Sequence, residues 1–155
     1  MTGMEQEDLE TTQKNILIVE DDNDIAQSMA NTLKKLGHTI GGIFAKAEDA
    51  LLEIRNISPD LVLMDVVLAG VTDGIEAGQH IEDTLKIPVI YLTGYPDKAA
   101  MLENNGKVPL SKPFDAEELK NAIGVVFYMV SYREKRAKDA SSEKISSQSD
   151  EARDV

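Results

Sequence analysis

Three runs of apolar residues in this chain contain no alternation with polar residues. Each run therefore predicts a strand buried on both faces, as in a parallel sheet. The runs are 16–19, 61–64 and 89–92, and two weaker strand-like segments are 39–44, which glycines interrupt, and 108–110, which is brief. Together these segments predict five short strands.

Apolar residues recur at helical spacing between the predicted strands. In the first such segment, the inward face is predicted to consist of Ile25, Met29, Leu33 and Leu36. We expect Asn23 or Asp24 to cap this helix and Gly37 to end it. The charge of Asp22 is expected to favour the helix N-terminus. Further helices are predicted at 47–55, from 73–74 to about 85, at 97–103 and from 115 to about 132.

Strand and helix alternate five times, which predicts an α/β fold. Short loops and right-handed crossovers then imply a doubly wound, five-stranded parallel sheet with helices on both faces. The flavodoxin-like strand order 2-1-3-4-5 is the common solution at this size, although periodicity alone leaves other doubly wound orders open.

The chain divides into three parts on this pattern. Residues 1–13 are acidic and lack periodicity, so we expect them to be disordered. The folded domain is predicted to occupy residues 14–132. Residues 133–155 form a charged tail that contains several serines and cannot bury a core, so we expect a helix extension followed by disorder.

The charge balance narrows the classes of partner. The chain carries 16 basic and 28 acidic residues, a formal net charge of -12, and no cysteine. An acidic body is a poor match for nucleic acid or an anionic membrane. No apolar run approaches the ~20 residues of a membrane span, and the first residues do not have the pattern of a signal peptide. We therefore expect a cytoplasmic location with no membrane contact.

The ends of the predicted strands carry the chemistry. The carboxyl ends of strands in such a sheet open onto one crevice, and the residues there are Glu20, Asp21, Asp65, Thr93 and Lys112. Crowded carboxylates need a hard cation, and Mg²⁺ prefers oxygen ligands. Aspartate is an established covalent nucleophile toward phosphoryl groups, while an ammonium and a hydroxyl can stabilise phosphoryl oxygens.

Four stretches of the sequence together resemble the receiver domain of response regulators. They are 16–22 (ILIVEDD), 61–65 (LVLMD), 88–93 (PVIYLT) and 110–114 (LSKPF), and the resemblance covers roughly residues 15–132. It implies that Asp65 takes a phosphoryl group from a histidine kinase or a phosphotransfer protein. It also implies Mg²⁺ as the cofactor, with Asp21 as a ligand and Glu20 orienting a metal-bound water. The backbone carbonyl of Val67 is the further implied ligand.

The resemblance assigns the remaining site residues and exposes one departure. Thr93 is the implied hydroxyl switch and Lys112 the implied cationic clamp, which a cis Lys112–Pro113 peptide bond aims into the crevice. Receivers usually carry a rotating aromatic residue three positions before the lysine, where this chain has Pro109. Because proline has no side chain that can swing, we expect phosphorylation to be reported through residues 94–106 instead.

The loop that follows Asp65 also departs from the family pattern. It is one residue longer before Asp73 and Gly74 than in the commonest form of the family.

Three classes of function remain open at this stage. The first is a signalling phosphoacceptor, not an enzyme in the ordinary sense, that assists its own phosphorylation and dephosphorylation. It would act on a downstream protein, since we expect no DNA-binding module after residue 132. The second is a metal-dependent phosphatase with an aspartyl-phosphate, which Val67 disfavours because such enzymes carry a second aspartate there. The third is a receiver-like binding module that is never phosphorylated. The partner kinase and the oligomeric state are left open.

Overall fold

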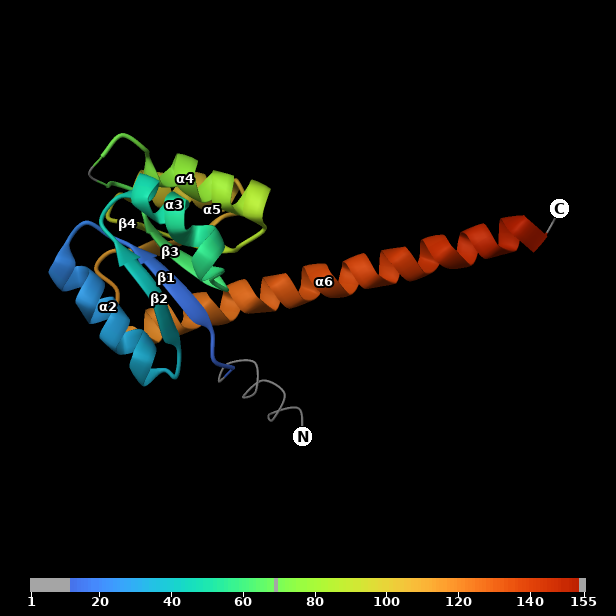
Figure 1. Ribbon diagram of the computed structural model, residues 1–155, viewed down its shortest axis with the longest axis horizontal. Helices are drawn as coiled ribbons and strands as arrows, with labels where there is room; N and C mark the ends of the chain where they lie inside the picture. Colours follow the sequence, from blue (N-terminus) through green and yellow to red (C-terminus); the bar gives the residue numbers. More distant parts are fainter. Residues whose placement is uncertain (1–11, 69, 154–155) are drawn as a thin grey trace.

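The computed structural model describes residues 12–68 and 70–153 and contains one parallel sheet between two layers of helices (Figure 1). The five strands lie in the order β2-β1-β3-β4-β5, which confirms the predicted doubly wound topology. The strands are β1 (Asn15–Val19), β2 (Thr39–Phe44), β3 (Leu61–Asp65), β4 (Val89–Thr93) and β5 (Val108–Ser111). The helices are α2 (Asn23–Lys35), α3 (Ala47–Ile57), α4 (Gly74–His80), α5 (Pro96–Asn104) and α6 (Ala116–Arg153), and a π-helix η1 (Ile81–Leu85) continues α4.

Each face of the sheet has its own apolar core, because successive strand residues point to opposite faces. Ile16 and Ile18 of β1 pack with α2 and α6, whereas Leu17 and Val19 pack with α3, α4, η1 and α5. The central strand β3 is buried along its whole length. The unbroken apolar runs therefore reflect strands covered on both sides.

Helix α2 begins one residue earlier than a cap at Asn23 would place it, and two residues earlier than a cap at Asp24 would. The N-cap is Asp22, whose side chain accepts hydrogen bonds from the N–H groups of Asp24 and Ile25 at 3.0 and 3.1 Å. The prediction of Asn23 or Asp24 was wrong because Asp22 keeps an extended backbone and so leaves the next residue free to start the helix.

The inward face of α2 also differs from the prediction. Ala26 and Ala30 are buried with Met29 and Leu33, while Ile25 is 36% exposed. Small alanines let the helix approach the sheet closely, so the contact stripe is centred on them. A pattern built on large apolar residues therefore misassigned Ile25.

Helix α6 runs much further than residue 132. It continues without a break to Arg153 and projects away from the sheet (Figure 1). No glycine or proline lies between residues 125 and 153, so nothing in the backbone chemistry stops the helix. The predicted disorder at the C-terminal end of the tail is therefore replaced by helix through Arg153, whereas the predicted disorder at residues 1–11 lies outside the described residues. In the part of the chain described, no helix has the length and apolar character needed to cross a bilayer.

A buried polar contact links β4 to the end of the α4–η1 segment. The Tyr91 side chain is fully buried, and its hydroxyl donates a hydrogen bond of 2.6 Å to Glu82 Oε1 in η1. Lys107 Nζ lies 3.3 Å from the same carboxylate oxygen. Burial, together with the hydrogen bond to Glu82, raises the pKa of Tyr91, so the phenol stays protonated and donating. The Tyr91 ring occupies the space that a side chain at Gly78 would need.

We expect Gly78→Ala to destabilise the fold by about 1–3 kcal/mol, because its methyl group would overlap the rigid Tyr91 ring. Gly124→Ala in α6 is the matched control, since a Cβ there meets no atom within 4 Å. That substitution should stabilise the protein by about 0.5–1 kcal/mol through helix propensity. Urea unfolding of both variants measures the difference, and equal effects would contradict the packing argument.

Candidate functional site

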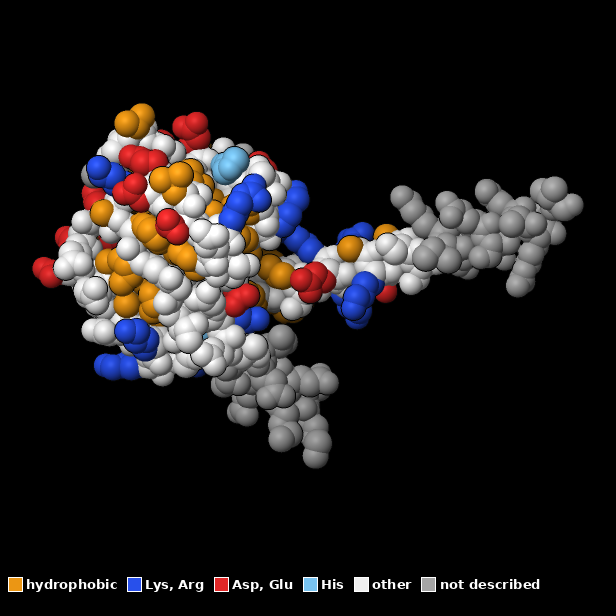
Figure 2. Space-filling view, in the orientation of Figure 1, with side chains coloured by type: hydrophobic (Ala, Val, Ile, Leu, Met, Phe, Trp, Pro, Cys, Tyr) orange, Lys and Arg blue, Asp and Glu red, His pale blue; other side chains and the backbone are white. Residues whose placement is uncertain are grey.

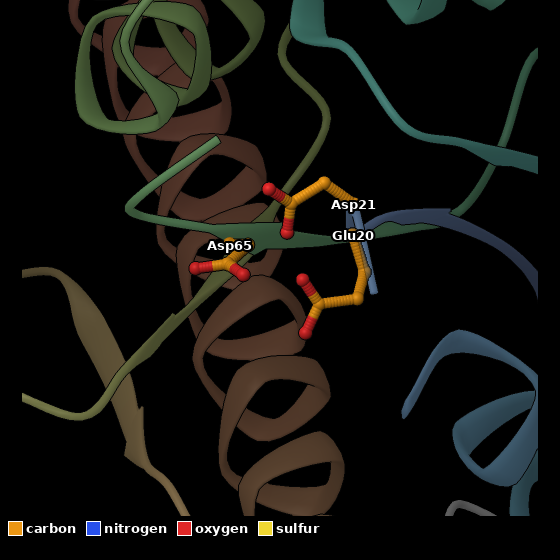
Figure 3. Close-up of side chains that lie close together, drawn as sticks. All are labelled: Glu20, Asp21 and Asp65. Atoms are coloured by element: carbon orange, nitrogen blue, oxygen red, sulfur yellow. The ribbon is translucent and has the colours of Figure 1, made fainter. Parts of the chain in front are cut away.

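Three carboxylates converge at the carboxyl edge of the sheet (Figure 3). Glu20 and Asp21 directly follow β1, and Asp65 is the last residue of β3. One oxygen of each lies within 4.8 Å of the others. Glu20 and Asp65 are 2% and 5% exposed, whereas Asp21 is open to solvent. The structure thus brings together the three acidic residues that the strand ends predicted.

Backbone pairing continues past the strand ends and fixes these residues. Glu20 N–H donates to Phe44 O at 2.9 Å, which extends the pairing of β1 with β2. Lys112 N–H donates to Thr93 O at 2.8 Å, which extends the pairing of β4 with β5. The site is therefore positioned by the rigid sheet itself rather than by loop side chains.

Lys112 bridges two of the carboxylates. Its Nζ lies 2.6 Å from Glu20 Oε1 and 2.8 Å from Asp65 Oδ2. Burial disfavours the charged ammonium, but the hydrogen bonds to Asp65 and Glu20 outweigh it and raise the pKa of Lys112. The Lys112–Pro113 peptide bond is cis, which confirms the expectation from the family resemblance.

The carboxyl group of Glu20 has a raised pKa. Burial, a hydrogen bond shared with Asp65 and the Asp65 charge together raise the pKa of Glu20 to about 7, although Lys112 opposes them. Its Oε2 atom is buried without a hydrogen-bond partner among the described residues. A buried oxygen of this kind, next to two further carboxylates, fits a hard divalent cation such as Mg²⁺.

Both oxygens of Asp65 are held from opposite sides. Oδ1 accepts a 3.0 Å hydrogen bond from the N–H of Val67, and Oδ2 faces Lys112 Nζ. The Val67 side chain is half exposed. The metal-ligand role of the Val67 carbonyl stays a prediction.

Thr93 ends β4, one residue beyond Leu92, which is the partner of Asp65 in the sheet register. Its side chain is buried, and Oγ1 accepts a 3.0 Å hydrogen bond from the N–H of Tyr95. The hydroxyl can still donate its own hydrogen. A displacement of Thr93 would therefore act directly on the first residues before α5.

One contact at the site has no counterpart in the sequence analysis. The Glu48 carboxylate, in the first turn of α3, accepts hydrogen bonds from the N–H groups of Val71 and Thr72 at 3.3 and 3.4 Å. Gly70 has a φ of +107°, and a side chain there would overlap the Glu48 carboxylate. The lengthened loop after Asp65 is thus attached to α3. The partners lie 23 and 24 residues apart, so no local pattern reveals them.

A groove of about 480 Å³ opens beside Lys112, between the start of α2 and the loop that joins β5 to α6. Its lining is mostly apolar and consists of Asp24, Ile25, Ser28, Met29, Lys112, Pro113 and Phe114. The outward turn of Ile25 therefore contributes to a surface next to the carboxylate cluster.

Comparison with known proteins supports one family. Residues 16–124 match the family described as "Response regulator receiver domain". The chain is 34% identical over 128 residues to the "Uncharacterized transcriptional regulatory protein YrkP" of Bacillus subtilis (strain 168), covering 80% of this chain and 54% of that protein. It is 31% identical over 129 residues to the "Phyllosphere-induced regulator PhyR" of Methylorubrum extorquens, covering 81% and 48%.

Solved structures agree with this comparison. The structure of the response regulator PhyR from Brucella abortus has a TM-score of 0.74 at 25% identity, covering 87% of this chain and 56% of that chain. The structure of the anti-anti-sigma factor PhyR from Bartonella quintana has a TM-score of 0.73 at 26% identity, with the same coverage. The chain spans about half the length of the curated relatives it matches.

The perturbed Glu20 predicts a pH-dependent stability of the metal-free protein. Because its pKa is raised from 4.5 to about 7, the folded protein holds this proton more tightly than the unfolded chain does. The stabilisation is present below pH 4.5 and is lost as pH rises to about 7, up to about 3 kcal/mol.

Urea unfolding between pH 4.5 and 8 in EDTA measures this loss, and Glu20→Gln should abolish the corresponding slope. The exposed Glu53→Gln on α3 is the control and should keep the wild-type profile. Parallel profiles for wild type and Glu20→Gln would contradict the assignment.

Proposed function

The chain belongs to the response regulator receiver domain family, and we propose that it accepts a phosphoryl group on Asp65 in a Mg²⁺-dependent reaction. The donor is a histidine kinase or a phosphotransfer protein. The observation that carries the proposal is the Asp65 carboxylate itself, held by Val67 N–H and Lys112 at the sheet edge beside Glu20 and Asp21. The Asp65 carboxylate supplies the nucleophile, and the partly buried Lys112 ammonium supplies positive charge for a phosphoryl oxygen.

The proposed transfer is a displacement at phosphorus. An oxygen of Asp65 forms the new bond while the phosphorus–nitrogen bond of a phosphohistidine breaks, and the imidazole leaves with the bonding electrons. Lys112, already 2.8 Å from Oδ2, neutralises charge on a phosphoryl oxygen. Thr93 donates its hydroxyl hydrogen to another. The same arrangement would assist hydrolysis of the acyl phosphate.

The metal site would be built by Asp21 and Asp65, with the Val67 carbonyl as a further ligand and Glu20 orienting a bound water. The buried, unpartnered Glu20 Oε2 and the all-oxygen donor set support this assignment. Bound Mg²⁺ supplies positive charge that lets an anionic phosphoryl group approach an anionic carboxylate.

We place the phosphodonor at the groove between α2 and the β5–α6 loop. Lys112 lines this groove and also contacts Asp65, so a donor seated there is next to the acceptor. The groove is mostly apolar and includes Ile25 and Phe114, which suits the apolar face of a donor helix. Histidine kinases use ATP, so the proposal includes a cytoplasmic location, and we propose a protein as the downstream target.

Asp65→Asn should abolish phosphoryl uptake and leave the fold intact, because the amide is near-isosteric but is a poor nucleophile. Incubation with acetyl phosphate and Mg²⁺, followed by intact mass measurement, tests this. The exposed Asp83→Asn is the control and should gain one phosphoryl group like the wild type. Phosphoryl uptake by Asp65→Asn would contradict the proposal. If the wild type takes up no phosphoryl group from acetyl phosphate or from a phosphohistidine donor, the result would favour a receiver-like binding module that is never phosphorylated.

The same assay distinguishes Asp21, the proposed metal ligand, from the adjacent Asp22, which caps α2. Asp21→Asn should slow phosphoryl uptake at least ~10-fold at limiting Mg²⁺, since few protein groups hold the cation. Asp22→Asn keeps a good N-cap residue on α2 and should retain the wild-type rate. Equal rates for the two variants would count against a metal at this site.

Output is proposed to pass through Thr93 into residues 94–106. A pull of Thr93 toward the phosphoryl group disturbs its hydrogen bond from Tyr95 N–H, whereas Pro109 offers no side chain that can swing. Hydrogen exchange with and without a beryllofluoride mimic should show altered protection at 94–106. Identical exchange of this segment in both states would rule out the route.

A further inference from the structure

Helix α6 has an exposed apolar stripe on the side that faces away from the sheet. Val125, Tyr128 and Tyr132 are 51%, 68% and 53% exposed and lie three and four residues apart, so they share one helix face. Leu119 and Val126 of the same helix are buried against the sheet. The helix is thus apolar on two sides, and among the described residues only one of these sides is covered.

Charged residues flank this stripe with opposite signs at its two ends. At 3.6 residues per turn, Glu117 and Glu118 lie on either side of the line of the stripe before it. Lys135 and Arg136 lie on either side of the same line after it. All four side chains are exposed. Figure 2 shows Lys and Arg side chains along α6 where it leaves the body.

We propose that α6 is a homodimer interface in which the stripes of two copies pack antiparallel. Around a two-fold axis between residues 125 and 128, Val125 of each helix faces Tyr128 of the other. The same axis sets Glu117 opposite Lys135 and Glu118 opposite Arg136, twice over, because residues on the same side of the stripe meet in such a self-complementary interface. A parallel pair would set acids against acids and bases against bases, which is repulsive.

The stripe is too short for a long coiled coil. Beyond Tyr132 the next position on the line of the stripe is Asp139, and Lys135 and Ser142 lie beside it, so the positions that follow are polar. A coiled-coil seam would need apolar residues there. A second copy supplies both an apolar stripe of the same length and the matching charges. The Arg136 guanidinium lies 6.0 Å from the Tyr132 ring centroid. Arg136 is therefore at the border of the stripe, where Glu118 of the second copy would contact it.

The interface is small, so the dimer is expected to be weak and sensitive to salt. In sedimentation equilibrium of the unphosphorylated full chain at low salt, the mass should rise from one toward two protomers with concentration. Added salt should reverse the rise. A wild-type protein that stays monomeric up to about 1 mM would overturn the proposal.

Tyr128→Glu should weaken association by about tenfold or more, because it buries a charge at the centre of the stripe. Leu52→Glu is the matched control, since Leu52 is 77% exposed on α3 and lies outside the stripe. It should dimerise like the wild type. Equal loss in both variants would point to a different surface and overturn the assignment.

Charge reversal tests the antiparallel order. Glu118→Lys and Arg136→Glu should each weaken the dimer, and the double variant should restore it, because the two residues meet only between chains. Circular dichroism checks that each variant keeps its helix. A double variant as weak as the singles, or singles equal to the wild type, would overturn the antiparallel pairing. The test is independent of Asp65 chemistry, so it separates this inference from the proposed function.

Discussion

The double contact of the Lys112 ammonium with Glu20 and Asp65 is the interaction on which the site depends. Two carboxylates that are almost fully buried repel one another and lose their hydration, and the ammonium between them offsets part of that cost. The three residues lie 92 and 47 positions apart along the chain. Only adjacent parallel strands that end at the same edge bring them together, and the buried apolar runs hold that edge in place.

The same arrangement leaves the three carboxylates with less positive charge nearby than they need. One Glu20 oxygen contacts the Lys112 ammonium, and the other has no hydrogen-bond partner in the described part of the chain. The pKa of Glu20 is raised well above the ordinary value for a carboxyl group. A site that is short of positive charge favours a divalent cation. Lys112 therefore links the ends of β1, β3 and β5, and it already contacts Asp65, the proposed phosphoryl acceptor.

The β4–β5 pair determines which residues can transmit the proposed phosphorylation signal away from the site. Tyr91 and Pro109 are neighbours in register, so the aromatic ring in this region belongs to β4 rather than to the edge strand β5. Tyr91 is fixed by burial, by Gly78 and by its hydrogen bond to Glu82, and cannot swing as an edge aromatic would. The contact between Thr93 and Tyr95 leads instead toward α5, next to β5 and apart from the stripe on α6.

The sequence by itself determined the strands and the acidic cluster, because unbroken apolar runs and strand-terminal polar residues have few alternative placements in a doubly wound sheet. It favoured the observed strand order but left other doubly wound orders open. Tertiary structure decided the rest. Ile25 faces outward because Ala26 and Ala30 pack closer, and Glu48 holds a loop 23 residues away. Gly78 is required by a ring on another element. Each of these depends on contacts between segments far apart in the chain, whose geometry local spacing does not contain.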